Sequence, residues 1–132
     1  MNGGVTTLDQ AQGFLDAGLD GVMIGRSAYH APCDILCAAD RRIFGVGGDT
    51  NAADTVRAMV PYIDAHLAQG GKLNQITRHM LGLFTGRPGA RIWRRMLSEG
   101  AHLPGAGSAL VLEALAAVET LGEALAQPQE AV

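Results

Sequence analysis

The sequence predicts an α/β segment followed by an all-α segment. A short apolar run at residues 22–24 lies between glycines directly after an amphipathic stretch, as a buried parallel strand would after a helix. A glycine-rich loop at 45–51 separates this part from the rest of the chain. Beyond that loop the apolar residues recur only with helical spacing. We therefore expect a domain boundary between residues 45 and 46.

The first helix is expected over residues 7–17. Thr7 and Gln10 have the spacing of a capping box, and an apolar stripe follows them. One helix with one strand cannot satisfy the strand's backbone or cover both faces of a sheet. The order of loop, helix, strand, loop and helix is the repeat of a (β/α)8 TIM barrel. Residues 1–45 therefore look like its last helix–strand units, with an N-terminal portion missing.

Two further helices are expected before the boundary. Ser27 can cap a short helical turn, and Pro32 suits the first turn of a helix that continues to residue 44. Residues 46–132 predict four helices joined by short connections, which is typical of an antiparallel four-helix bundle. These helices are expected at about 51–69, with a kink or split at Val60 before Pro61, and at 73–85, 90–98 and 108–125.

Charge is unevenly distributed along a chain whose net charge is −3. No Asp or Glu occurs between Asp64 and Glu99, whereas arginine is frequent there. Arg91, Arg94 and Arg95 are spaced i, i+3 and i+4, so they share one face of a helix. A basic segment that also holds an aromatic ring, here Trp93, is typical of polyanion binding, and Trp93 is expected to point away from the three arginines. The alternative is an ordinary solvated helix face, which Arg87 and Arg78 could extend in either case.

Two glycine-rich turns predict an anion site. Gly3 and Gly4 follow one inferred strand end, and Gly25 with Arg26 follows the next. Such turns expose backbone N–H groups, the following helix adds its dipole, and arginine offers a fork for phosphate oxygens. The alternative is that these glycines only form turns and that Arg26 is a surface charge.

The remaining reactive side chains predict no other site. Cys33 and Cys37 are spaced i, i+4, but no further Cys or suitable His accompanies them, so we expect small buried apolar residues rather than a zinc site. His79 is interpreted as a satisfied, partly buried residue. We find no nucleophile–base pair and no paired carboxylates. The N-terminus lacks the pattern of a secretory signal and no apolar run is long enough for a membrane helix, so a cytoplasmic protein is expected.

Several stretches resemble one known family. NGGVTTLDQAQGFL, DGVMIGRSAYHAP, VPYIDAHLAQG and above all ITRHMLGLFTGRPGARIWRRMLS are similar to the C-terminal part of the FMN-dependent tRNA-dihydrouridine synthases, in particular their A subfamily. The long stretch at residues 76–98 is the specific one. The NGG and MIGR pieces also occur in other flavin barrels. The resemblance extends to about Leu115.

The resemblance implies a fold, a reaction and several binding residues. In this family an N-terminal TIM barrel binds FMN, NADPH reduces the flavin, and the reduced flavin delivers a hydride to uridine 20 or 20a in the D loop of tRNA. Asn2, Gly3 and Gly4 match the family's flavin-contacting residues, and Gly25 and Arg26 match its phosphate-contacting pair. Positions matching tRNA contacts of the helical domain are Arg91 and Arg94.

The resemblance also implies what this chain lacks. The family's catalytic cysteine, its other flavin contacts and most of its uridine pocket have no match in the sequence, and Cys33 and Cys37 follow the last strand. Residues 1–45 are then the remnant of the FMN-binding barrel and residues 46–132 a tRNA-binding domain. We expect no turnover from this chain alone. The alternatives are a non-catalytic helical RNA-binding module and an inactive truncated fragment.

Overall fold

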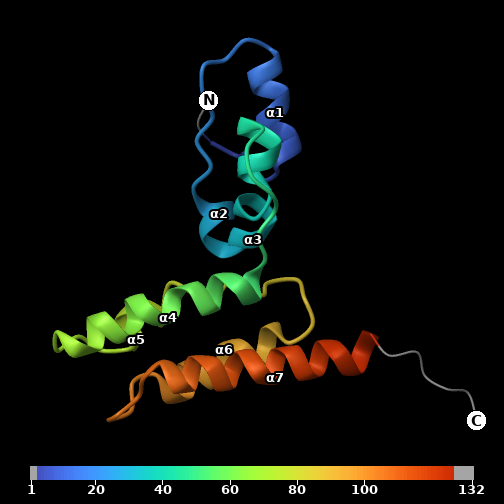
Figure 1. The fold of residues 1–132 in the computed structure, drawn as a ribbon. Coiled ribbons are helices and arrows are strands. Elements are labelled where there is room, and N and C mark those ends of the chain that lie inside the picture. The colour runs from blue at the N-terminus through green and yellow to red at the C-terminus, as the bar shows by residue number, and fades with distance from the viewer. Residues whose placement is uncertain (1–2, 127–132) are drawn as a thin grey trace, which may run out of the picture. The chain divides into compact units, whose positions relative to one another are not determined.

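The computed structural model describes residues 3–126 and divides the chain into two compact units, Met1–Ala52 and Ala53–Val132. Figure 1 shows that the described chain is built mainly from helices. The helices of the first unit are α1 (Leu8–Asp16), α2 (Arg26–His30), α3 (Pro32–Leu36) and the π-helix η1 (Asp40–Phe44). Those that follow are α4 (Ala52–Ala68), α5 (Asn74–Thr77), α6 (Ala90–Gly100) and α7 (Ser108–Ala126).

Helix α1 begins as the capping pattern predicts. The Thr7 hydroxyl accepts a hydrogen bond from the backbone N–H of Gln10 at 3.1 Å. The Gln10 side chain accepts from the N–H of Thr6 at 2.8 Å instead of that of Thr7. The reciprocal half of the capping box is therefore displaced by one residue, and both bonds still satisfy N–H groups at the start of the helix.

The strand expected at residues 22–24 is not formed. Within residues 3–126, only Met23 has a bridge-type backbone pairing, and its side chain is 53% exposed. A parallel strand requires neighbouring strands for its hydrogen bonds and helices on its faces. The described part of the chain contains no strand beside it, so residues 22–24 form no ladder within that part.

The helix expected from Pro32 to residue 44 is divided. Pro32 occupies the first turn of α3 as predicted, but α3 ends at Leu36, and η1 begins at Asp40 after a turn. The Cys37 carbonyl at this break accepts a hydrogen bond from the Thr50 N–H at 2.8 Å. Ser27 does not cap α2, because Gly25 is the N-cap residue and makes no side-chain cap bond.

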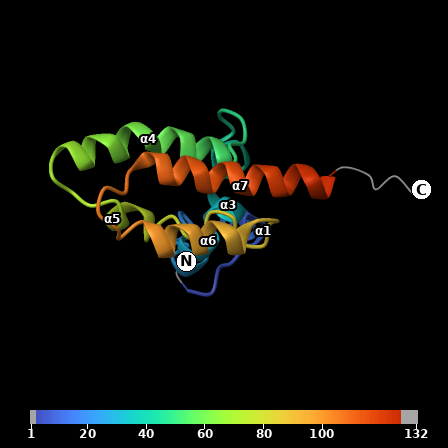
Figure 2. The ribbon, with the colours of Figure 1, turned by 90° about the horizontal axis from the view of Figure 1, so that it is seen from below.

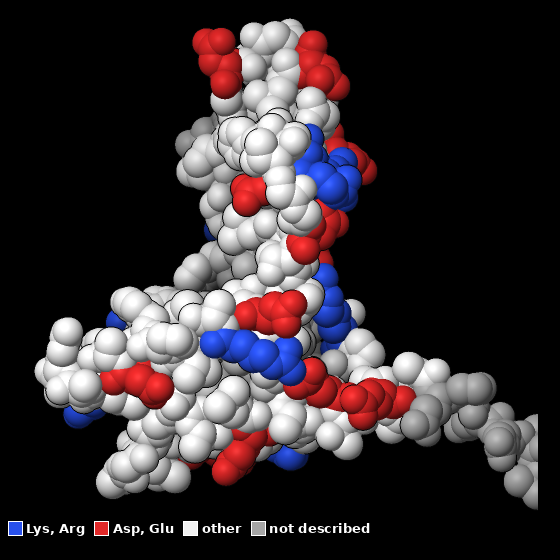
Figure 3. Space-filling model, in the orientation of Figure 1, with Lys and Arg blue, Asp and Glu red and all other residues white. Residues whose placement is uncertain are grey.

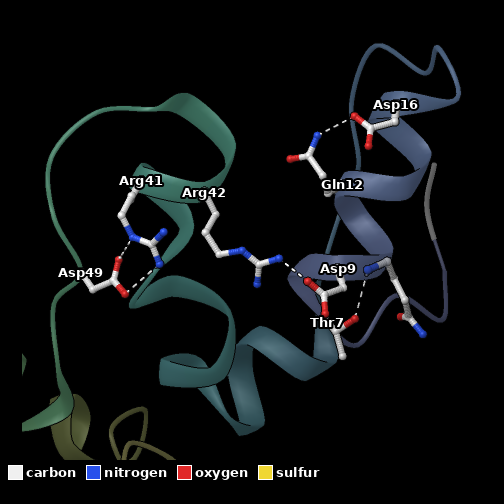
Figure 4. A network of polar contacts seen from close by, with 8 residues as sticks. Thr7, Asp9, Gln12, Asp16, Arg41, Arg42 and Asp49 are labelled. Atoms are coloured by element: carbon white, nitrogen blue, oxygen red, sulfur yellow. Dashed lines mark hydrogen bonds and ion pairs between the residues drawn. The ribbon is translucent and has the colours of Figure 1, made fainter.

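Ion pairs join distant parts of the first unit (Figure 4). Arg42 of η1 pairs with Asp9 in the first turn of α1. Arg41 holds Asp49 with two hydrogen bonds, at 2.6 Å from Nε and 3.1 Å from Nη2. The hydrogen bond from Arg41 lowers the pKa of the Asp49 carboxyl below its usual value, since it favours the charged form.

Helix α4 runs antiparallel to α7 in the second unit. The Arg57 guanidinium contacts the Glu119 carboxylate at 2.7 Å, and the Ser108 hydroxyl donates to Asp64 at 2.7 Å. Later residues of α4 therefore contact earlier residues of α7, as in an antiparallel pair. The helix continues through Pro61, so the split expected at Val60 does not occur.

Helix α6 also runs antiparallel to α7, at close range. A Cβ atom at Gly89 would lie 2.9 Å from Val118 Cγ1, and one at Gly100 would lie 2.9 Å from Leu110 Cδ2. Gly89 has a φ of 91°, so glycine is favoured there for its conformation as well as for its size. Figure 2 shows α7 between α4 and α6.

The segment over residues 73–85 is mostly not α-helical. Only α5 is an α-helix, and a series of turns with i to i+3 hydrogen bonds follows it. The Met80 carbonyl lies in this series, where it accepts from the Leu83 N–H at 3.2 Å and from the Trp93 indole at 2.9 Å. These turns and the tertiary bond stand in place of the i to i+4 bonds of a continuous helix. The residues predicted to face inward are nevertheless mostly buried: Leu73, Ile76, Met80 and Phe84.

None of the helices in residues 3–126 combines the length and the apolar character needed to cross a membrane.

Candidate functional site

The two glycine turns predicted to form an anion site line one cleft. The cleft belongs to the first unit and has a volume of about 410 Å³. Its lining consists of Gly3, Gly4, Val5, Thr6, Met23, Gly25, Arg26 and Ser27. The structure therefore brings together both predicted pieces, which are separated by more than twenty positions in the sequence. Asn2, the third residue of the predicted NGG contact, lies outside the described residues.

The chemistry of this cleft suits an anion. Gly3 and Gly4 have φ angles of 105° and 70°, and a Cβ on either would meet no atom within 4 Å, so their backbone faces open space. Arg26 is exposed and adds a guanidinium to the rim, and no carboxylate belongs to the lining. Helix α2 has only five residues, so the dipole contribution expected from a following helix is small.

Three arginines form an exposed face on α6. Arg91, Arg94 and Arg95 are exposed, whereas Trp93 and Leu97 on the other side of the same helix are buried. None of the three forms a salt bridge with any residue in the range 3–126. Their side chains are therefore available to an external anion. We call this set the α6 arginine face.

Trp93 does not belong to that face, as its position on the helix predicts. Its side chain is 0% exposed, and its indole N–H donates to the Met80 carbonyl. Its ring packs edge-on against Phe84, with ring centroids 5.0 Å apart. Trp93 is a core residue that holds α6 against the turns of residues 78–86, and the basic face has no aromatic ring from α6.

Arg78 and Arg87 lie on the turns that precede α6, and both are exposed. The Arg78 Nε donates to Nε2 of His79 at 3.2 Å. His79 is exposed, so the expectation that it is partly buried is wrong. Acidic side chains are also present in the second unit, including Glu99 on α6, and Figure 3 shows them at several places on the visible face.

Cys33 and Cys37 are joined by a disulfide bond in the structure. Cys33 is buried as expected, but the pair is bonded and does not act as two separate apolar side chains. No group of three His, Cys, Asp or Glu side chains in the described part of the chain is arranged to hold a metal ion.

Sequence reasoning missed a set of polar residues next to the α6 arginine face. Asn74, Ser98 and His102 line hollows in the second unit. The signal was present, because Ser98 and His102 continue the i+3 and i+4 spacing that begins at Arg91. A survey of Lys, Arg, Asp and Glu along the chain counts neither serine nor histidine, so it did not single out these positions.

Comparison with known proteins shows the family. The chain belongs to the dihydrouridine synthase family, whose sequence model matches residues 1–119. This is a family of TIM-barrel enzymes, and the described part of this chain is mostly helical.

The relatives at high identity share one name. A tRNA-dihydrouridine(20/20a) synthase of Salmonella typhi is 54% identical over 116 residues, which cover 87% of this chain and 34% of the relative. The protein of that name from Shewanella oneidensis is 52% identical over 121 residues, covering 91% and 36%. That of Escherichia coli K12 is 56% identical over 108 residues, covering 80% and 30%. The chain thus spans about a third of the length of these relatives.

Proposed function

We propose that this chain is the C-terminal part of an FMN-dependent tRNA-dihydrouridine synthase that reduces uridine 20 or 20a in the D loop of tRNA with NADPH. The observation that carries the proposal is the meeting of Gly3, Gly4, Gly25 and Arg26 in one cleft, in a chain of the dihydrouridine synthase family. The relatives are named tRNA-dihydrouridine(20/20a) synthases, which supports tRNA as the substrate. Because tRNA is the substrate, the cytoplasm is the compartment that we expect.

The cleft fits the phosphate end of FMN. Its donors are backbone N–H groups of glycines in open positions and the guanidinium of Arg26, a combination that suits a dianionic phosphate. FMN supplies the hydride chemistry when it is bound. The residues of this chain hold the phosphate and so fix one end of the cofactor. The rest of the FMN-binding barrel belongs to the N-terminal portion that the relatives possess and this chain does not match.

The α6 arginine face is proposed as the tRNA contact. Arg91 and Arg94 are the central residues, with Arg95, Arg87 and Arg78 beside them. Guanidinium groups bind phosphates of a nucleic acid and set its position without reading its sequence. Arg91, Arg94 and Arg95 form no ion pair with a described residue, which supports this role, since no such partner has to be displaced. The face would orient the tRNA so that one uridine reaches the flavin.

Binding of a tRNA transcript to the chain tests the RNA half of the proposal. Arg91→Ala and Arg94→Ala should each weaken binding and lower the slope of log affinity against log salt by about 1. Arg41→Ala is the matched control, because it removes an exposed arginine from the first unit. If affinity does not depend on salt or on either α6 change, the proposed tRNA contact is wrong.

Turnover tests the enzymatic half. The chain alone should form no dihydrouridine from NADPH and tRNA, whereas the chain joined to the N-terminal portion of a relative should form it when loaded with FMN. In that joined protein, Arg26→Ala should weaken FMN retention. Clear activity of the chain alone would contradict the proposal. Salt-dependent binding together with a joined protein that neither retains FMN nor turns over would favour the second candidate, a non-catalytic helical RNA-binding module.

A further inference from the structure

Two adjoining hollows run across the second unit where α5 and the end of α6 meet. The larger has a volume of about 570 Å³ and lies between the residues joining α4 to α5 and those joining α6 to α7. The smaller, of about 260 Å³, lies between the α5 region and the second half of α6. Asn74, Ala101 and His102 line both hollows. The two therefore form one groove, which we call the α5–α6 groove.

The lining of this groove combines an apolar floor with a basic and polar rim. The floor includes the buried side chains Leu73, Leu97 and Ala101. Exposed polar residues around it are Lys72, Asn74, Arg78, Ser98 and His102. Among the described residues no carboxylate lines either hollow, although Glu99 is exposed on α6 nearby. A ligand that suits this surface has negative charge, hydroxyl groups and a compact apolar part.

The groove continues the α6 arginine face. Steps of three and four residues from Arg91 lead through Arg94 and Arg95 to Ser98 and then to His102. All of these residues are exposed, and the last two line the groove. A polyanion that lies on the arginines and follows this side of α6 therefore enters the groove at Ser98.

We infer that the α5–α6 groove seats a ribose-phosphate segment of the bound RNA strand, with Lys72, Arg78 and His102 around the phosphate and Asn74 and Ser98 beside the ribose. This inference rests on the proposed RNA-binding function and extends it to Lys72, Asn74, Ser98 and His102. Asparagine and serine can both donate to and accept from the 2′-hydroxyl, which an acidic polypeptide does not have. RNA therefore fits the rim better than an acidic protein does.

Added negative charge at the rim tests the inference on the full chain with a tRNA transcript. Asn74→Asp and Ser98→Asp each place a carboxylate beside the segment and should weaken binding about fivefold or more. Ala116→Asp is the matched control, because it makes the same charge change at an exposed position of α7 that lines neither hollow. It should change affinity by less than about twofold. Thermal melting of each variant checks that all remain folded.

Removing a positive charge from the rim provides a second measurement. Lys72→Ala should lower the slope of log affinity against log salt by about 1, which a residue with a purely structural role would not do. Competition with polyglutamate distinguishes RNA from acidic protein, and RNA should compete far better at equal charge concentration. Equal competition would overturn the assignment to RNA.

The outcomes separate the two proposals. If both groove variants bind like Ala116→Asp while Arg91→Ala and Arg94→Ala still weaken binding, the groove does not seat RNA and the proposed function stands. If the unaltered chain shows no salt-dependent affinity for tRNA, the proposed RNA contact and the groove fail together.

Discussion

Trp93→Phe should lower the stability of the protein without changing how the folded protein binds RNA. The indole N–H donates to the Met80 carbonyl at 2.9 Å in a site with no solvent exposure, and such a bond contributes about 1 kcal/mol. The carbonyl keeps its bond from Leu83 N–H, so no buried acceptor is left without a partner. The smaller ring also leaves a void beside Phe84, which costs about 1 kcal/mol more. The expected loss in free energy of unfolding is about 2 kcal/mol.

Urea unfolding followed by circular dichroism measures this loss, since the variant removes the only tryptophan that fluorescence could follow. Trp93→Ala should cost roughly 3–5 kcal/mol, because it removes the whole buried ring. tRNA affinity of Trp93→Phe, measured well below its unfolding transition, should equal that of the unaltered chain. An unchanged urea midpoint together with weaker tRNA binding would refute the assignment of Trp93 to the core and return it to the binding face.

Two further changes test the packing of the second unit and the ion pairs of the first. Gly89→Ala should destabilise the protein by roughly 2–4 kcal/mol in urea unfolding, because its Cβ would lie 3.2 Å from the Val118 backbone at a positive φ. Gly86→Ala, at a positive φ with no atom within 4 Å, should cost only about 1 kcal/mol, and equal costs would show that close approach to α7 is unimportant. Asp49→Asn should lower the melting temperature at neutral pH. Because Arg41 depresses the pKa of Asp49, the difference from the unaltered chain should persist above the ordinary Asp value of about 3.9 and vanish as pH falls through the lower folded value. A difference that stays constant into strong acid would exclude this pair as its cause.

Local signals in the sequence predicted those features that depend on neighbouring residues. The Thr7 cap, Pro32 in a first turn and the helix from Ser108 onward each follow from chemistry within a few positions. The strand at residues 22–24 could not form from its own pattern, because sheet hydrogen bonds need a partner strand. The helix expected over residues 73–85 is replaced by turns after α5, and the Met80 carbonyl in these turns accepts from Trp93, thirteen positions away, a contact that local spacing does not give.

Parts of the candidate site were predictable for the same reason. The α6 arginines follow from helical spacing, and the two glycine turns were expected to lie together because barrel loops meet at one end of a sheet. The position of Trp93 away from the arginines also follows from spacing, since Trp93, Leu97 and Ala101 are four residues apart and all three are buried. The α5–α6 groove depends on how two loops pack, which spacing along one helix does not give.

The amphipathic character of α6 links the stability of the second unit to the proposed RNA contact while keeping the two separable. Trp93 fixes one side of α6 to the preceding turns, and Gly89 allows close approach to α7 at its start. These contacts hold Arg91 and Arg94 in register on the opposite side. A domain of ordinary stability, about 5–15 kcal/mol, remains more than 90% folded after a loss of about 2 kcal/mol. Core variants should therefore lower the urea midpoint without changing the affinity for tRNA. Arginine variants should weaken tRNA binding without changing the urea midpoint. A core variant that weakened binding while fully folded would show that α6 had shifted, and a smaller salt slope would show that phosphate contacts had been lost.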